Sequence, residues 1–370
     1  MEKLLFKGKT MLYYAQMACD TLMKKFAPGE LPPVRHFHYH QGVFLSGMEK
    51  TYQLCGDEKY FYYIKGWVDS LIDAYGNITS FNPGQLDDLQ PGILLFPLLA
   101  HTGDQRYKTA MDTIAYYMGS FPRNPEGGFW HKAWYRNQMW LDGLYMAGPF
   151  MAQYGAEYSK TEFFDAVVFQ AKLMEQKTRD KKTGLWYHAW DYEKKQPWAD
   201  PSTGLSPEFW GRAMGWVTVA LLDDLDFFPE DHPGLPELVR IVRDLLLALL
   251  PYQDEKTGLW YQVINKGGQA GNWVESSCTC LYAAAICKAV RLGLWEEKHL
   301  NAAVKACAGL VDRLAYDENG VLIDNICIGT GVGDYAHYCA RPTSTNDLHG
   351  VGAFLIMCAE MEQIRRHKTK

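Results

Sequence analysis

The chain has 370 residues, of which 48% are hydrophobic and 22% charged, as in a protein with a large core and no disordered stretch. Its formal net charge is −6 and its Lys and Arg residues are scattered, which argues against nucleic acid or an anionic membrane surface as a partner. The first ten residues lack the apolar core of a signal peptide, and no run of about 18 apolar residues occurs. We therefore expect a cytoplasmic protein without membrane spans.

Two kinds of helical segment alternate along the chain. The first kind is amphipathic with a period near 3.6 residues, and these segments lie near residues 10–25, 58–75, 105–119, 160–176, 236–252 and 298–314. The second kind is richer in Gly, Ala and other small residues, as helices packed on both sides tend to be. These inner segments begin near Gln41, Asp87, Trp140, Trp210, Trp273 and Asn346.

A sequence motif typical of a turn recurs between the two kinds of segment. Asp-x-x-Thr-Gly-Leu-Trp-Tyr occupies residues 180–187, a close copy occupies residues 254–261, and looser copies lie at 124–130 and 317–322. Because the inner segments start about 60 residues apart, internal repetition decides the fold. We predict an all-α (α/α)6 barrel, a single domain over residues 1–370, with short β-hairpins in the loops at its mouth. An open solenoid is the alternative, but no polar capping repeat supports it.

In such a barrel the inner helices run parallel, so their N-termini meet at one mouth. Asp142, the third residue of a Trp-Leu-Asp-Gly run, is the strongest functional candidate there. Asp87, Asp88 and Asp347 are as well explained as helix N-caps or first-turn acids. The expected starts of the inner helices carry more carboxylate, imidazole and indole side chains than helix capping requires. The residues at these six starts are Tyr39-His40-Gln41, Asp87-Asp88, Trp140-Leu-Asp142, Trp210-Gly-Arg212, Trp273-Val-Glu275 and Asn346-Asp347-Leu-His349.

The mouth should attract an anionic ligand, because several helix N-termini point at it. Arg212 offers a bidentate fork for a carboxylate, and Lys132 adds a point charge unless it is an ordinary surface residue. Trp140 and Trp210 are candidate walls around a sugar ring, although Trp residues of the core would look the same. Two further histidines, His131 and His188, follow the Gly-aromatic turns and serve either the chemistry or the structure.

Other motifs carry less weight. Gly329-Thr-Gly-Val-Gly333 resembles a dinucleotide loop, but no βαβ unit surrounds it, and we expect the following Asp334-Tyr335 not to open a helix. The chain has no His-Glu-x-x-His, Walker or Gly-x-Ser-x-Gly motif, which argues against the common metalloprotease, nucleotide-binding and serine-hydrolase classes. Its nine Cys residues lack a disulfide pattern, so we expect reduced and mostly buried thiols.

With these residues in place, the chain resembles the unsaturated rhamnogalacturonyl hydrolases of glycoside hydrolase family 105, which are related to the unsaturated glucuronyl hydrolases of family 88. The resemblance covers nearly the whole chain. Its markers are Gln41-Gly-Val-Phe44, Leu86-Asp87, Pro91-Gly92, Gly128-Phe-Trp-His-Lys132, Trp140-Leu-Asp142-Gly, Trp186-Tyr-His188, Trp210-Gly-Arg212 and Asn346-Asp-Leu-His-Gly350.

The resemblance implies that Asp142 is the catalytic carboxylate of a hydrolase and that no metal or organic cofactor is needed. It implies a substrate-binding site made of His40, Asp87, Lys132, Trp140, His188, Trp210 and Arg212. His40 departs from the pattern, because some relatives carry Tyr immediately before the Gln-Gly-Val run. The implied partner is an unsaturated uronate-containing oligosaccharide from pectin, and we expect a monomer or weak homo-oligomer.

The implied reaction hydrates the C4=C5 bond of a 4,5-unsaturated uronic acid, with Asp142 acting first as acid and then as base. Such a role calls for a pKa raised toward neutrality, and we expect Trp140 and Asp87 to raise it. Two alternatives remain open. One is an inverting glycosidase that uses Asp87 and Asp142 on a saturated substrate. The other is a sugar epimerase or binding protein, with His188 and His349 as paired bases.

Overall fold

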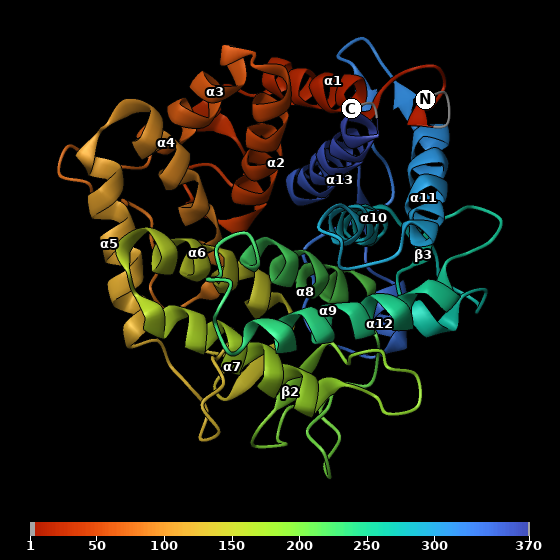
Figure 1. The fold of residues 1–370 in the computed structure, drawn as a ribbon. Coiled ribbons are helices and arrows are strands. Elements are labelled where there is room, and N and C mark those ends of the chain that lie inside the picture. The colour runs from red at the N-terminus through yellow and green to blue at the C-terminus, as the bar shows by residue number, and fades with distance from the viewer. Residues whose placement is uncertain (1–3, 369–370) are drawn as a thin grey trace.

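The computed structural model describes residues 4–368 as two rings of helices (Figure 1). Within these residues, six outer and six inner helices alternate along the chain. The outer helices are α1 (Met11–Lys25), α3 (Glu58–Asp69), α5 (Gln105–Gly119), α7 (Thr161–Thr178), α9 (Leu235–Leu249) and α11 (Leu300–Arg313). The inner helices are α2 (Tyr39–Cys55), α4 (Leu95–Thr102), α6 (Asp142–Tyr158), α8 (Gly211–Asp224), α10 (Ser276–Arg291) and α13 (Leu348–His367). The predicted (α/α)6 barrel is confirmed.

The inner ring is closed rather than open. Helices α6, α8, α10 and α13 pack in this order, α13 returns to α2, and α2 and α6 both pack on the segment that leads into α4. In Figure 1, α5, α7, α9 and α11 lie toward the outside of the molecule, with α6, α8 and α10 nearer its centre. The solenoid alternative is wrong, because the last inner helix packs against the first.

Glycines allow the closing helices α2 and α13 to approach each other. A Cβ atom on Gly352 would lie 2.4 Å from the carbonyl oxygen of Val43, and one on Gly47 would lie 2.6 Å from the Cβ of Leu355. Both distances are too short for a side chain, so the backbones meet because glycine stands at these positions. This contact explains why the inner segments are rich in small residues.

The second inner helix differs from the prediction. Instead of one helix from Asp87, the chain forms 3-10 turns at Leu86–Asp88 and Gln90–Leu94 and only then the short helix α4. Pro91 at the start of the second turn has no N–H to donate. As a result, Asp87 lies on a tight turn at the mouth rather than on a regular helix.

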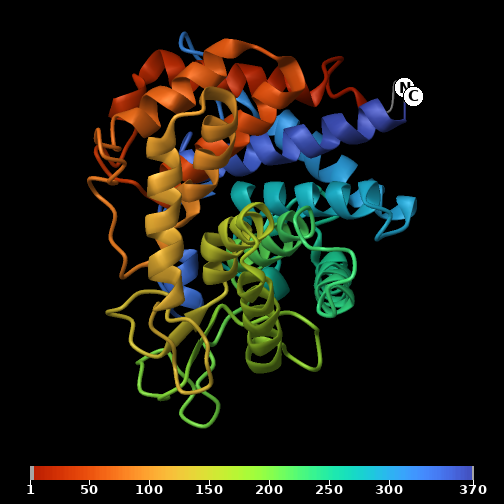
Figure 2. The same ribbon diagram turned by 60° about the vertical axis from the view of Figure 1, so that its left-hand side comes forward.

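Short strand pairs occupy the loops at the mouth, as predicted. They are β1 (Gln138–Trp140) with β2 (Ala189–Asp191), β3 (Trp260–Tyr261) with β4 (Val274–Glu275), β5 (Ala315–Tyr316) with β6 (Val321–Leu322), and β7 (Ile326–Cys327) with β8 (Thr343–Ser344). Strands β1 and β4 lead directly into α6 and α10. Figure 2 shows the long loops around β1 and β2 gathered at one end of the barrel.

One expectation about the loops is wrong. The helix α12 (Tyr335–Cys339) does begin directly after the glycine-rich run, because the side chain of Asp334 accepts a hydrogen bond from the His337 amide at 2.8 Å and caps it. The absence of a surrounding βαβ unit still separates this loop from a dinucleotide site.

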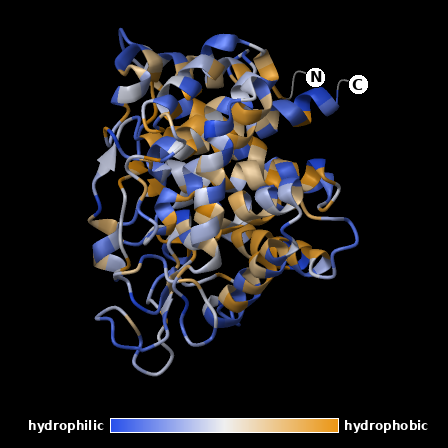
Figure 3. Ribbon diagram, turned by 90° about the vertical axis from the view of Figure 1, so that its left-hand side faces the viewer, coloured by the Kyte–Doolittle hydropathy of each residue, from blue (hydrophilic) through white to orange (hydrophobic). Residues whose placement is uncertain are grey.

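The core follows the hydropathy of the helices. Hydrophobic residues concentrate on the helices of the interior, and hydrophilic residues on the loops (Figure 3). All nine Cys residues are free and seven of them are buried, as the sequence predicts. Within residues 4–368, no helix combines the length and apolar character that a membrane crossing requires.

Candidate active site

Asp142 is the first residue of α6, and its side chain meets that of His188. His188 Nε2 lies 3.1 Å from Asp142 Oδ2, and His188 is fully buried. The backbone sets this contact: strands β1 and β2 pair with Trp140 opposite Ala189, and the amide of Leu141 donates to the His188 carbonyl at 3.0 Å. The residues that follow β1 and precede β2 therefore lie side by side.

The charge state of Asp142 differs from the expectation. Burial raises the pKa of this carboxyl, but the hydrogen bond from His188 and the charges of His188, His131 and Arg212 together hold it below its ordinary value. The expectation of a raised pKa is therefore wrong. The sequence indicated burial beside Trp140 but not the hydrogen bond from His188 or the nearby His131 and Arg212.

Asp87 forms a separate ion pair at the mouth. Its Oδ2 lies 2.6 Å from Lys132 Nζ, and its Oδ1 lies 3.4 Å from His131 Nε2. Burial raises the pKa of Asp87, while the charges of His131 and Lys132 outweigh burial and hold the pKa below its usual range. Lys132 is thus no free surface residue, and the charge of Asp87 is largely compensated.

The two tryptophans connect these groups. Trp140 stacks on His131 with ring centroids 4.6 Å apart and on Tyr135 at 4.9 Å, and it meets His188 edge to face at 5.4 Å. Trp210 lies against His188 at 4.6 Å and is only 1% exposed. Trp140 is 7% exposed. The buried Trp210 ring therefore packs against His188. Contact of Trp210 with a sugar stays a prediction.

Arg212 is almost fully buried, and its guanidinium is already engaged. Nη1 donates to the Cys327 carbonyl at 2.6 Å and Nη2 to the Ile328 carbonyl at 2.9 Å, while the guanidinium lies 4.5 Å from the centre of the Trp210 ring. The positive charge still acts on Asp142. Arg212 thus holds the segment after β7 in place, and a direct bond to a ligand carboxylate stays a prediction.

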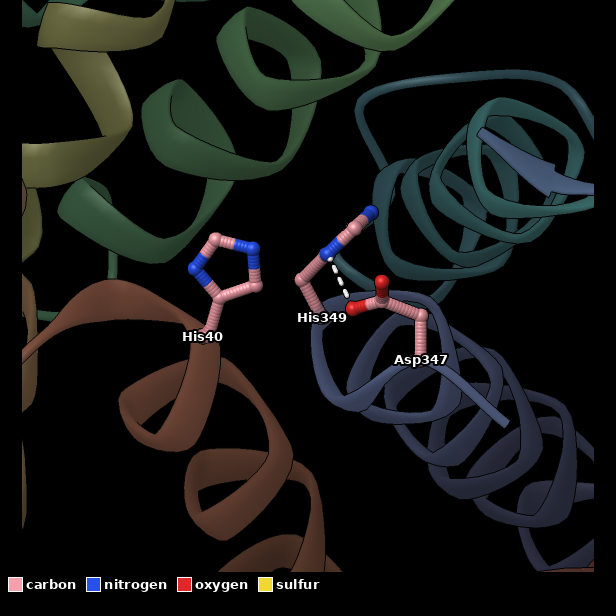
Figure 4. A group of neighbouring side chains, drawn as sticks. All are labelled: His40, Asp347 and His349. Carbon is pink, nitrogen blue, oxygen red and sulfur yellow. Dashed lines mark ion pairs between the residues drawn. The ribbon is translucent and has the colours of Figure 1, made fainter. Parts of the chain in front are cut away.

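His40 belongs to a third group, the imidazole cluster, formed by His40, Asp347 and His349 at the starts of α2 and α13 (Figure 4). His349 Nδ1 lies 2.8 Å from Asp347 Oδ1, and its Nε2 lies 3.0 Å from the Cys327 carbonyl. Burial and the neighbouring His349 lower the pKa of His40 to about 3, so its ring is neutral near pH 7.

The imidazole cluster is where a metal ion would fit best among residues 4–368. It is the one group of His, Cys and acidic side chains in that range whose ligand atoms all lie within 4.8 Å of one another. Two imidazoles and a carboxylate are a donor set that zinc accepts. However, the Asp347 carboxylate already lies 2.8 Å from His349 Nδ1, so the cluster is also explained as a contact between these two side chains beside the neutral His40.

The remaining acids at the helix starts have structural partners. Asp88 Oδ1 lies 3.0 Å from His38 Nδ1, and its Oδ2 accepts from the Asn82 amide at 2.9 Å. Glu275 caps α10 by accepting from the Cys278 amide at 2.6 Å. Of the three acids for which capping was the alternative, Asp87 and Asp88 lie in the first turn of a 3-10 helix and Asp347 stands at the N-cap position of α13, but none of them caps its helix through a side-chain hydrogen bond.

A cavity of about 320 Å³ lies at the opposite end of the barrel. Its walls include Ser46, Lys50, Gln153 and Asp223, which belong to the later turns of α2, α6 and α8. None of the predicted site residues lines this cavity, so it is separate from the mouth.

Comparison with known proteins agrees with this geometry. The model of Glycosyl Hydrolase Family 88 matches residues 14–365. The chain belongs to glycosyl hydrolase family 88. A solved structure of a family 105 glycoside hydrolase from C. acetobutylicum superimposes on this family 88 hydrolase with a TM-score of 0.90 and 34% sequence identity, covering 95% of this chain and 99% of that one. The family resemblance inferred from the sequence is confirmed.

Curated relatives of this family 88 hydrolase include a named enzyme. Unsaturated rhamnogalacturonyl hydrolase YesR of Bacillus subtilis is 28% identical over 297 residues, which is 79% of each chain. Protein Atu3128 of Agrobacterium fabrum is 34% identical over 230 residues, which covers 58% of this chain and 97% of that protein. The chain is therefore a glycoside hydrolase, and its substrate is a separate question.

Two tyrosines of this family 88 hydrolase were missed as site residues. The pKa of Tyr39 is raised by burial, and its ring lies against those of His40, with centroids 4.2 Å apart, and His349, with centroids 6.1 Å apart. Tyr338 lies on α12, and its hydroxyl is 2.6 Å from His188 Nδ1. Tyr39 stood beside a predicted residue, but no sequence pattern pointed to Tyr338, which is 150 positions from His188.

Proposed function

We propose that this hydrolase releases the 4,5-unsaturated uronic acid from the non-reducing end of lyase-generated rhamnogalacturonan oligosaccharides. The reaction is hydration of a vinyl ether, and Asp142 is its acid and base. Membership of family 88 supports hydrolysis of a glycoside, and the name of the Bacillus subtilis relative supports this substrate.

The observation that carries the proposal is the contrast between the two carboxylates of the mouth. Asp142 has a single hydrogen-bond partner among the described side chains, His188, so its other oxygen is available for a ligand. Asp87 is paired with Lys132 at 2.6 Å and faces His131 at 3.4 Å. An inverting glycosidase needs a second carboxylate to activate water, and the ion pair with Lys132, which lowers the pKa of Asp87, makes Asp87 a weaker base for that role. One available carboxylate fits a reaction in which one group acts twice.

The proposed chemistry begins with protonation of C4 by Asp142. The C4=C5 electrons form the new C–H bond, and positive charge develops at C5 and the ring oxygen. The Asp142 carboxylate then accepts a proton from a water molecule that attacks C5. The resulting hemiketal opens, the ring rearranges, and the remaining sugar leaves with its glycosidic oxygen as an alcohol. Asp142 ends the cycle protonated, as it began.

The surroundings of Asp142 define what substrate binding has to change. The pKa of Asp142 lies below its ordinary value because of His188, His131 and Arg212, despite burial. An anionic uronate placed beside Arg212 would compensate its positive charge and exclude water, and both effects raise the pKa of a carboxyl. We propose that the substrate itself brings Asp142 to the protonated state that the first step needs.

The other predicted residues have supporting roles in this proposal. Lys132 and Arg212 supply the positive charge that favours the uronate, and Trp140 forms a flat wall beside Asp142. In this proposal His40 and Trp210 line the site around the sugar ring of the uronate. His188 orients the Asp142 carboxylate through its Nε2 atom.

The test is a panel of purified disaccharides. Loss of the ultraviolet absorption of the C4=C5 bond, together with release of rhamnose from the unsaturated rhamnogalacturonan disaccharide, is the expected result. A preference for an unsaturated disaccharide that carries another sugar would keep the mechanism and replace the substrate. Cleavage of saturated disaccharides, with the unsaturated ones left intact, would overturn the proposal in favour of a conventional glycosidase.

A further inference from the structure

Tyr338 continues the hydrogen-bond chain that begins at Asp142. Its hydroxyl oxygen lies 2.6 Å from His188 Nδ1, on the side of the imidazole ring opposite the atom that meets Asp142. Tyr338 and His188 are both fully buried, and the Tyr338 ring stacks on Trp210 with centroids 5.8 Å apart. The contact is therefore held by packing on both partners.

The direction of the hydrogen bond between Tyr338 and His188 follows from a third group. The amide of Gly333 donates to the Tyr338 hydroxyl oxygen at 3.3 Å. The hydroxyl oxygen could accept a second hydrogen bond, but its own hydrogen would then have no acceptor among the described residues, so the hydroxyl is assigned as the donor to His188 Nδ1. Burial raises the pKa of Tyr338 well above its usual value, so the hydroxyl keeps this hydrogen.

An imidazole that accepts at Nδ1 carries its hydrogen at Nε2. His188 Nε2 then donates to Asp142 Oδ2 at 3.1 Å and has no lone pair with which to take a proton from the carboxyl group. When Asp142 is protonated, its proton must lie on the other oxygen, Oδ1. That oxygen is the one left for the substrate.

We propose that Tyr338 is a positioning residue: it fixes the tautomer of His188 and so keeps the acidic proton of Asp142 on the oxygen that faces the substrate. This inference rests on the proposed role of Asp142. It adds that the glycine-rich segment 329–333 and α12 serve the chemistry by holding one hydroxyl against the far side of His188.

Other charged and titratable groups surround this chain of hydrogen bonds. Asp142 is influenced by His131 and Arg212, and Tyr338 is influenced by Glu208 and Cys327. Tyr39 and Asp87 lie close enough to take part in the same electrostatic network. Because Tyr338→Phe changes none of these groups, a shift in the pH dependence of that variant reports on the hydroxyl.

The first experiment measures the tautomer directly. Nitrogen-15 spectra of the full-length protein with labelled histidine distinguish a protonated from an unprotonated ring nitrogen, and the His188→Gln variant identifies the signals of His188. We expect His188 Nδ1 to be unprotonated in the wild-type protein at neutral pH and to gain protonation in Tyr338→Phe. A wild-type His188 with hydrogen on Nδ1 would overturn the inference, whatever the substrate is.

The second experiment measures kinetics on the unsaturated disaccharide. In Tyr338→Phe, His188 is free to take a second proton, which stabilises the Asp142 carboxylate. We expect kcat to fall by about 10- to 100-fold with KM within about twofold, and the alkaline limb of the kcat/KM profile to move to lower pH. Equal loss at every pH would overturn the inference, as would full activity.

The matched control is Tyr63→Phe. Tyr63 is also a buried tyrosine whose hydroxyl makes one strong hydrogen bond, donating to the Phe26 carbonyl at 2.8 Å on the outer helix α3. This variant should keep the wild-type pH profile. If wild-type enzyme leaves the C4=C5 bond intact, the proposed function fails, and the nitrogen-15 result still decides the tautomer.

Discussion

Replacing Lys132 by Met tests whether the Lys132–Asp87 pair is the compensated ion pair that its geometry indicates. The change removes the cation and keeps most of the apolar stem of the side chain. Asp87, whose side chain is 6% exposed, is then left with His131 alone at 3.4 Å. We expect a buried and poorly compensated carboxylate, which destabilises the folded protein.

The size of this effect follows from the distance. Two unit charges at the observed 2.6 Å attract by about 6 kcal/mol in an effective dielectric of about 20. Desolvation offsets part of that attraction, and loss of one partner of a buried pair costs about 3–5 kcal/mol. Because His131 still faces Asp87, we expect the lower end, about 3 kcal/mol of unfolding free energy.

The pH dependence has a definite sign. In the wild-type protein the pKa of Asp87 is held below its ordinary value, so the pair stabilises the fold at neutral pH and this stabilisation is lost as the pH falls. Without Lys132 the effect of burial dominates, and the pKa of Asp87 rises. Lys132→Met should therefore be most destabilised relative to wild type near neutral pH and least at acidic pH.

The assay is urea unfolding followed by tryptophan fluorescence, with midpoints compared at equal m-values. The double variant Asp87→Asn/Lys132→Met removes both charges and should recover part of the loss. As a matched control, Lys195→Met breaks the exposed pair with Glu193 and should cost less than about 1 kcal/mol. If the double variant were no more stable than Lys132→Met, the reasoning about a compensated pair would be refuted.

Two further predictions concern the wild-type enzyme. Because the pKa of the Asp142 carboxyl lies below its usual range and the first step requires its protonated form, kcat/KM should rise as the pH falls from about 8 toward 5, and a value that rises toward alkaline pH would contradict this assignment. Dialysis against a chelator should leave kcat unchanged. Stoichiometric metal whose removal abolishes activity would instead indicate a metal in the imidazole cluster.

The fold was predictable because it rests on repetition. The hydrophobic period of the outer helices and the small residues of the inner ones are local properties, and their alternation reveals six similar units, four of which also share a turn motif. Gly47 and Gly352 then allow α2 and α13 to meet and close the ring. The exception, the broken second inner helix, also has a local cause in Pro91.

The site was predictable only in part, because its chemistry depends on contacts between distant segments. Asp142 and His188 were singled out separately, and the pairing of β1 with β2 brings them together. The direction of the Asp142 pKa shift was missed, since it results from the hydrogen bond with His188 and from His131 and Arg212, which belong to three other segments. The sequence suggested that the Arg212 guanidinium is available for a ligand carboxylate. In the structure it donates to the carbonyl groups of Cys327 and Ile328, which no sequence pattern placed nearby.

The central claim is that Asp142 delivers the proton to C4 of an unsaturated uronate. The most direct measurement is the decay of the ultraviolet absorption of the C4=C5 bond with wild-type enzyme and with Asp142→Asn, after both are shown to unfold at the same urea concentration. We expect decay with the wild-type enzyme and a rate lower by about 10²- to 10⁴-fold with the variant, because an amide keeps the shape but supplies no proton. Undiminished decay with Asp142→Asn would contradict the claim.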